Sequence, residues 1–175
     1  VCKELKKRNH HCVCVNWPDP FKCHISTWKK FIIEDLRCDK NTVLIGHSTG
    51  ALLAMRLLEM KIPLLGVILV SAAHTDLGDE GERISGYFDE PWDWSAVREN
   101  HEQVQFVHQF HSVDDHLIPV SEARFVAAQL KSPKHVYEEL RGYSHFFTPF
   151  DALLEAVDRY FPPGVVETEE VSSSK

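Results

Sequence analysis

The stretch Thr42-Val43-Leu44-Ile45-Gly46-His47-Ser48-Thr49-Gly50-Ala51 decides the fold of this 175-residue chain. Its first four residues are β-branched or apolar, which is typical of a short strand buried on both faces. The pattern Gly-x-Ser-x-Gly follows directly, and helical spacing of apolar residues then continues to Lys61. A strand, a sharp glycine turn and a helix in this order present the middle serine as a nucleophile, so Ser48 is the first candidate catalytic residue.

The glycine turn also predicts how negative charge beside Ser48 is stabilised. A Cβ at Gly46 or Gly50 is expected to collide with the neighbouring helix, because such a turn is strained and tightly packed. The helix N-terminus faces the serine, so the backbone N–H of Thr49 is the candidate oxyanion donor. The five-residue pattern arises by chance in about one chain in twenty of this length, and its position between a strand and a helix gives it weight.

Short apolar runs alternate with helical patterns along the rest of the chain. This alternation predicts an α/β fold with a doubly wound, mainly parallel sheet and helices on both faces. We expect a single domain over residues 1–161, a short cap-like insertion at about 72–100, and a disordered polar tail over residues 162–175. The predicted strands cover 11–16, 42–45, 64–71, 104–110 and 135–140, and the predicted helices cover 1–9, 25–36, 49–61, 94–100, 121–131 (capped by Ser121) and 149–161.

A serine hydroxyl is a weak nucleophile until a base removes its proton, so a carboxylate and then a histidine are expected after Ser48 in the chain. The loop after the strand over 104–110 carries Asp114 and Asp115, and either can serve. We favour Asp115, which lies four residues before Pro119, as in the usual hydrolase loop. His145 is the predicted base, because it follows the acid loop and the last strand, at whose carboxyl end open α/β sheets bind ligands.

The overall composition argues against several other classes of function. The formal net charge is −7, from 26 acidic and 19 basic residues, which does not favour a nucleic-acid partner. Because the chain has no apolar run long enough to cross a bilayer and no signal-peptide pattern, we expect no membrane association and a cytoplasmic location.

Neither a metal nor a cofactor is expected. His108 and His111 would point to different faces of their strand, which argues against a shared metal ion. The five cysteines all lie in the first 38 residues and lack a CxxC spacing, so they are interpreted as reduced thiols. Cys12 and Cys14 are expected to pack into the core from one face of a strand.

These residues and several further motifs resemble the retinoblastoma-binding protein 9 family, a small single-domain branch of the α/β-hydrolases. The resemblance covers nearly the whole chain up to about residue 161. It implies a serine hydrolase of small acyl esters, thioesters or aminoacyl amides, with a triad of Ser48, Asp115 and His145. The further motifs are Pro18-Asp19-Pro20, Val70-Ser71-Ala72, Asp76-Leu77-Gly78-Asp79-Glu80 with Glu82-Arg83, Ser85-Gly86-Tyr87-Phe88, Pro91-Trp92-Asp93-Trp94 and Gly142-Tyr143-Ser144-His145-Phe146.

The resemblance fits residues 76–94 as a short cap over the site. Four aromatic residues in it have two alternative roles: they wall an apolar acyl pocket, or they bury the insertion against the domain. These residues are Tyr87, Phe88, Trp92 and Trp94.

The sequence departs from the family at two places. The family's retinoblastoma-binding motif, Leu-x-Cys-x-Glu, corresponds to residues 36–40, where Lys40 replaces the glutamate and weakens the expectation of a retinoblastoma-type partner. The family's first strand and the glycine-rich loop that supplies a second oxyanion N–H would precede Val1. Without them, turnover is expected to be impaired. The alternative to an enzyme is therefore a protein of the same fold that acts through protein contacts.

Overall fold

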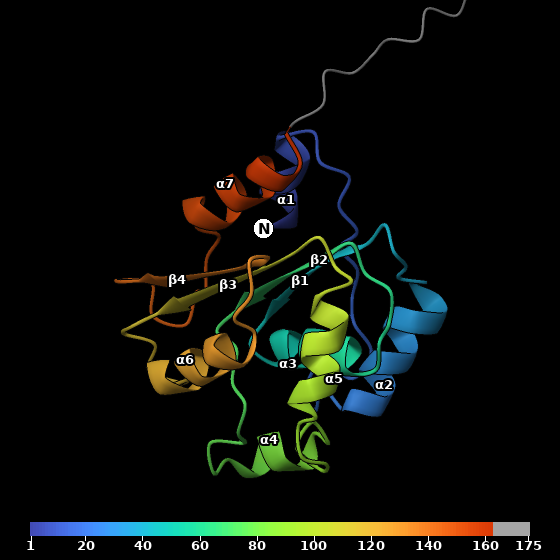
Figure 1. Ribbon diagram of the computed structural model, residues 1–175, viewed down its shortest axis with the longest axis vertical. Helices are drawn as coiled ribbons and strands as arrows, with labels where there is room; N and C mark the ends of the chain where they lie inside the picture. Colours follow the sequence, from blue (N-terminus) through green and yellow to red (C-terminus); the bar gives the residue numbers. More distant parts are fainter. Residues whose placement is uncertain (163–175) are drawn as a thin grey trace, which may run out of the picture. The chain divides into compact units, whose positions relative to one another are not determined.

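The computed structural model describes residues 1–162, in which four strands form one parallel sheet (Figure 1). The strands follow one another across the sheet in chain order. Because all of them run the same way, their carboxyl ends meet at one edge, and the loops after them gather there. The strands are β1 (Val43–His47), β2 (Gly66–Val70), β3 (Phe106–Ser112) and β4 (His135–Leu140).

Helices connect the strands, and Figure 1 shows α2, α3, α5 and α6 on the same face of the sheet. Helix α3 packs most deeply, since every residue from Ala51 to Leu58 is buried. The helices of this part of the chain are α2 (Ile25–Lys30) with a π-helical continuation η1 (Phe31–Asp35), α3 (Thr49–Glu59), α4 (Glu80–Ile84), α5 (Trp94–His101) and α6 (Val120–Gln129).

The interior of the sheet is formed by β2 and β3, whose residues are all buried. In β1 only Gly46 is buried, and its neighbours are half-buried or exposed. The expectation that this strand is buried on both faces is therefore wrong. In the described chain β1 pairs only with β2 and forms an edge of the sheet, so its other side lacks a neighbouring strand.

The described chain forms two compact units. One unit, Asn16–Phe147, contains the whole sheet and the helices between its strands. The other combines Val1–Val15 with the chain from Thr148 onward and holds α1 (Cys2–Lys7) and α7 (Asp151–Tyr160). The single domain expected over residues 1–161 stays a prediction. The predicted tail, from residue 163 on, lies outside the described residues.

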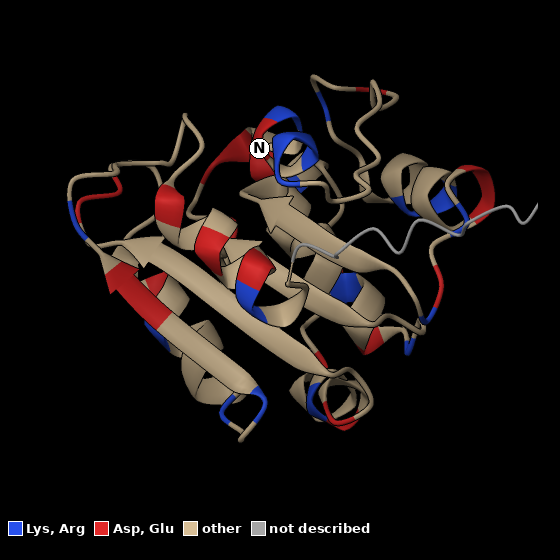
Figure 2. Ribbon diagram, turned by 90° about the horizontal axis from the view of Figure 1, so that it is seen from above, with Lys and Arg blue, Asp and Glu red and all other residues tan. Residues whose placement is uncertain are grey.

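Helices α1 and α7 belong to the second unit, and both bury apolar residues, including Leu5 of α1 and Leu153 of α7. Acidic residues recur along α7 and are red in Figure 2. One of them, Asp158, accepts a hydrogen bond from Arg8 and lies 2.8 Å from Nε2 of His10. These contacts lower the pKa of Asp158, with the bond from His10 as the larger cause.

Three sequence-based expectations outside the site are wrong. Residues 11–16 form no strand, because no strand of the described chain pairs with them and an extended segment needs such a neighbour to become part of a sheet. Cys12 is consequently half-buried and Cys14 exposed, so neither packs fully into the core. Ser121 lies within α6, whose N-cap position is Pro119, and it does not cap the helix.

Candidate active site

Ser48 occupies the turn between β1 and α3 with φ 55° and ψ −120°, a backbone conformation that L-residues rarely adopt. Its N–H donates to the carbonyl of Val70 on β2 at 2.9 Å, and its own carbonyl accepts the N–H of Ala51 at 2.8 Å. These bonds hold the turn between the strand and the helix. The arrangement is the strand, strained turn and helix expected for a nucleophilic serine.

The two glycines of the turn meet different surroundings. A Cβ built on Gly46 would lie 2.3 Å from the carbonyl oxygen of Gly50, so a larger residue cannot fit without moving the backbone. A Cβ on Gly50 would meet nothing within 4 Å. The expected collision is confirmed for Gly46, because the carbonyl group of Gly50 on the helix points at it. It is wrong for Gly50, because a side chain at that position would face open space.

Asp115 and His145 meet at the carboxyl edge of the sheet, although 30 residues separate them in the chain. Nδ1 of the His145 ring lies 2.9 Å from Oδ2 of Asp115 and 3.1 Å from Oδ1. A neutral imidazole that donates from Nδ1 keeps Nε2 free as a proton acceptor. Both side chains are almost fully buried. The pair can therefore hold a histidine in the tautomer that a general base requires.

Four contacts, one of them the bond from His145, keep Asp115 in its charged form. Burial by itself would raise the pKa of this carboxyl group, but hydrogen bonds from the Ile118 N–H, His145, the Ser71 hydroxyl and the Leu117 N–H outweigh it and lower the pKa. The Ser71 hydroxyl donates to Oδ2 at 2.8 Å, and the two backbone N–H groups donate to Oδ1 at 2.9 and 3.0 Å. The result is an ionised carboxylate with a fixed orientation beside His145.

Ser71 is a site residue to which the sequence analysis assigned no role. It lies directly after β2, at the same edge of the sheet as Ser48, and its side chain is buried. Its backbone has a positive φ of 51°. A single polar residue after a buried strand was the available signal, and it is weak because most such residues only end a strand.

Asp114, the alternative carboxylate, points elsewhere. Its oxygens accept the N–H of Gly142 at 2.7 Å, the N–H of Ser144 at 3.4 Å and the hydroxyl of Ser112 at 2.7 Å. The Ser112 hydroxyl and the Gly142 N–H, in that order, are the main causes that lower the pKa of Asp114. Asp114 therefore braces the backbone of the loop that carries His145, while Asp115 contacts the ring itself.

A cavity of about 400 Å³ opens between the glycine turn Gly46–Gly50 (the elbow), the loop that carries Asp115 and the start of the insertion. Ser48 and His145 both line it, so the two side chains face one space at one edge of the sheet. No hydrogen bond joins the Ser48 hydroxyl to His145 in the described residues, and such bonds often tighten only when substrate binds. The cavity is lined by Ser48, Thr49, Leu52, Ala73, Thr75, Leu77, Asp79, Glu82, Leu117, Ile118 and His145.

The four aromatic residues of the insertion are absent from that lining, as far as the chain is described. Tyr87 is fully buried and Phe88 packs against the hydrophobic core. The Trp92 and Trp94 rings stack on each other with centroids 5.5 Å apart. The packing role describes these residues in the structure, and their role in an acyl pocket stays a prediction. The insertion instead reaches the cavity through Thr75, Leu77, Asp79 and Glu82.

Arg56 of α3 ties the insertion to the helix behind the nucleophile. Its guanidinium donates to the carbonyls of Tyr87 and Glu90, each at 2.6 Å, and lies 3.8 Å from the centre of the Trp92 ring. Glu59 accepts a hydrogen bond from Arg56 at 2.5 Å and another from the backbone of the insertion. A nearly buried arginine with all these partners fixes the insertion that supplies one wall of the cavity.

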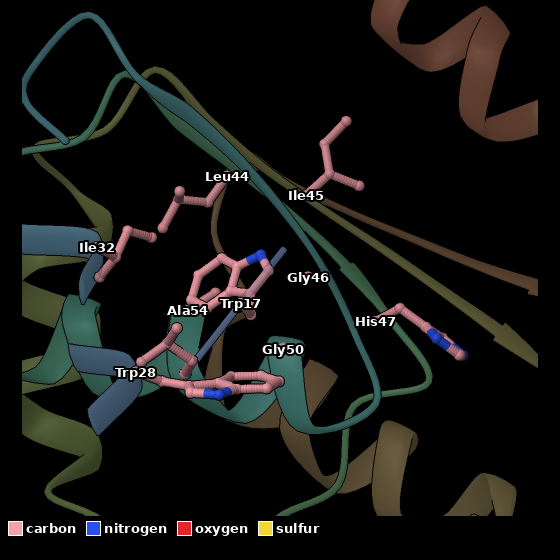
Figure 3. Close-up of a pocket in the computed structure, with 10 residues that line it drawn as sticks. Trp17, Trp28, Ile32, Leu44, Ile45, Gly46, His47, Gly50 and Ala54 are labelled. Atoms are coloured by element: carbon pink, nitrogen blue, oxygen red, sulfur yellow. The ribbon is translucent and has the colours of Figure 1, made fainter. Parts of the chain in front are cut away.

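A second, smaller cavity of about 190 Å³ lies on the other side of the elbow, at the free edge of β1 (Figure 3). Trp17 and Trp28 form its wall together with Leu44 and Ala54. Among the described residues that line it, Ser48 and His145 are absent, and both candidate catalytic residues line the larger cavity.

The family profile described as "Serine hydrolase" matches residues 3–146, which include every residue of this site. The chain belongs to this family. It is an enzyme of the serine hydrolase class, and the candidate catalytic residues named above all lie in the matched segment.

Individual relatives agree with this assignment. The chain is 37% identical over 154 residues to serine hydrolase RBBP9 of Rattus norvegicus, covering 88% of this chain and 80% of the relative. The predicted resemblance is therefore confirmed, and the chain is an RBBP9-like serine hydrolase.

Solved structures support the fold. The ydeN gene product from B. subtilis superposes with a TM-score of 0.75 at 22% identity, covering 91% of this chain and 87% of that one. Alpha/beta hydrolase domain-containing protein 10 from mouse gives a TM-score of 0.56 at 16% identity, with 81% and 71% covered. Together with the parallel sheet, these similarities establish the α/β-hydrolase fold predicted from the sequence.

In residues 1–162 no three His, Cys, Asp or Glu side chains are grouped in a way that could hold a metal ion. His108 instead contacts Glu138 at 2.8 Å, and Nε2 of His111 lies 3.0 Å from the carbonyl of Ile118. Among the described helices, none is both long enough and apolar enough to cross a membrane.

Proposed function

We propose that this serine hydrolase cleaves small acyl esters, thioesters or aminoacyl amides through an acyl-enzyme on Ser48. One observation carries the proposal: His145, fixed by Asp115, lines the same cavity as the hydroxyl of Ser48. The oriented imidazole can accept the serine proton, and the bound carboxylate stabilises the imidazolium that results.

The proposed reaction has two halves. In the first, Oγ of Ser48 attacks the substrate carbonyl carbon while Nε2 of His145 takes the hydroxyl proton. The bond to the alcohol, thiol or amine then breaks, and that group leaves with the proton from His145. In the second, water attacks the acyl carbon and loses a proton to His145. The bond from the acyl carbon to Oγ of Ser48 then breaks, His145 returns the proton to Oγ, and the free acid leaves.

Thr49 supplies the donor that we assign to the oxyanion. It is the first residue of α3 and lines the cavity beside Ser48. A first-turn N–H has no acceptor within its own helix, so it can point at the negative oxygen that forms during attack. The positive end of an 11-residue helix adds to this stabilisation.

Two carboxylates in the cavity favour the aminoacyl substrates within the proposed class. Asp79 and Glu82 both line the cavity with Ser48, and neither Lys nor Arg does so among the described residues. Burial, then the neighbouring Asp79 and Asp76, raise the pKa of Glu82, and the opposing effect of His145 does not offset them, so positive charge beside this carboxylate is in deficit. The ammonium group of an aminoacyl substrate would supply that missing positive charge.

The nucleophile is tested by labelling the chain with a fluorophosphonate probe and mapping the modified peptide by mass spectrometry. We expect one label, on Ser48, and no label on Ser48→Ala or on heat-denatured protein. Absence of label on the folded chain would contradict the proposed hydrolysis and favour the alternative of a protein that acts through protein contacts.

The acidic wall is tested with Glu82→Gln. We expect kcat/KM for an α-amino acid ester to fall about tenfold, the effect of losing one charge-assisted contact in a half-exposed site. The matching ester without the amino group should be hydrolysed at an unchanged rate. Equal losses for both esters would mean that Glu82 shapes the cavity without recognising charge. The control is Glu80→Gln, an exposed neighbour on α4 that does not line the cavity.

A further inference from the structure

His47 is the last residue of β1 and directly precedes Ser48, and it contacts the residue that the proposed mechanism uses as base. Its Nε2 lies 2.8 Å from the backbone carbonyl oxygen of His145. A carbonyl can only accept, so the ring donates from Nε2. The two imidazole rings lie with centroids 4.7 Å apart, inclined by 50°.

The His47 ring points away from the apolar cavity at the edge of β1. Figure 3 shows its imidazole turned away from Trp17 and Trp28, although His47 lines the same cavity. The polar end of the side chain is therefore used by the loop of His145.

The loop of His145 is held at several points, and the contact from His47 is made at the base itself. Asp114 holds the backbone at Gly142 and Ser144, before His145. The residues on both sides of His145, Ser144 and Phe146, have positive φ angles of 49° and 52°. Such conformations persist only when surrounding contacts enforce them. The bond from His47 is the contact that joins the base-bearing backbone directly to the strand that carries the nucleophile.

We infer that His47 is a positioning residue that holds the backbone of His145 at a fixed distance from Ser48. The expected effect on turnover rests on the proposed function, whereas the hydrogen bond between His47 and the backbone of His145 is independent of it. Because His47 and Ser48 are adjacent in the chain, the hydrogen bond from His47 couples any movement of the elbow to the backbone of His145.

The charge state of His47 fits this role. Desolvation of its ring and, second, the neighbouring His145 lower the pKa of His47, so it stays neutral at neutral pH. A neutral ring still donates from Nε2. It also adds no repulsion when His145 takes up the serine proton.

The test compares His47→Leu, which removes the donor, with His47→Gln, whose amide nitrogen reaches about as far as Nε2. We expect His47→Leu to lower kcat about 10- to 100-fold, since misplacing a catalytic group by about 1 Å costs up to 10²-fold. KM should stay within about twofold, because the side chain does not line the substrate cavity. His47→Gln should retain kcat within about threefold of the parent chain. His11→Leu, at an exposed position, is the matched control.

Hydrogen exchange of the peptide covering residues 141–147 provides a readout that does not require turnover. Exchange should be faster in His47→Leu and unchanged in His47→Gln. Unchanged exchange and kcat in His47→Leu, or equal loss in both variants, would overturn the positioning role. A parent chain that neither labels nor turns over, yet shows the exchange difference, would overturn the proposed hydrolysis and leave the link between His47 and His145 supported.

Discussion

Asp115→Asn is expected to lower kcat by about 10⁴-fold while leaving the fold intact. Asparagine has the shape of aspartate, so the bonds from Leu117 and Ile118 to its oxygen can persist. Its amide nitrogen, however, donates where Oδ2 now accepts from His145. The ring would then carry its proton on Nε2, and the Ser48 hydroxyl would face a donor instead of a base. Steady-state hydrolysis of a chromogenic ester measures the loss.

Asp114→Asn is the matched control for this prediction. It sits one position earlier and holds the backbone of the same loop, but it does not contact the His145 ring. We expect a loss of less than about tenfold, in line with one weakened hydrogen bond. Similar losses in the two variants would show that the carboxylate next to the ring has no special role, and the triad assignment would fail.

Gly46→Ala is expected to lower the free energy of unfolding by about 3 kcal/mol or more, and to abolish labelling of Ser48 in the fraction that folds. The added methyl would lie 2.3 Å from the Gly50 carbonyl oxygen, 2.5 Å from its carbon and 2.8 Å from the Ala51 nitrogen. All three are backbone atoms, so relief requires the helix to move away from the strand.

Gly50→Ala should have the opposite effect. Its Cβ would enter open space, and alanine in a helix is more stable than glycine by roughly 0.5–1 kcal/mol. Urea unfolding followed by tryptophan fluorescence measures both changes. If Gly46→Ala were as stable as the parent chain, the elbow would be packed less tightly than the short distances around a Cβ at Gly46 indicate.

Regular elements with strong local patterns were predictable from the sequence. The strand over 135–140 has the bounds of β4, and the strand and helix around Ser48 are β1 and α3. Elements without such a pattern were not. Helix α4 spans five residues, Glu80–Ile84, too few to show an apolar repeat. Residues 11–16 have strand-like composition, yet composition cannot supply the neighbour to which a strand must bond.

The candidate catalytic residues could be named from chain order, because a serine on a strand-turn-helix and a histidine after the last strand are each recognisable separately. The walls of the cavity were not recognisable. Leu77, Asp79 and Glu82 lie in the insertion, whose position depends on contacts with Arg56 and Glu59 of a distant helix. Tryptophans in the same segment, which looked suited to a pocket, are used to attach it.

The amino-acid sequence by itself determined the class of fold and the candidate nucleophile, because periodicity and turn chemistry act over a few neighbouring residues. Tertiary structure decided that Asp115, and not Asp114, contacts the His145 ring, brought Ser71 to that carboxylate and linked His47 to the backbone of His145. Those outcomes depend on which groups from separate strands reach one edge of the sheet. That is a matter of long-range packing, for which adjacent residues carry no local signal.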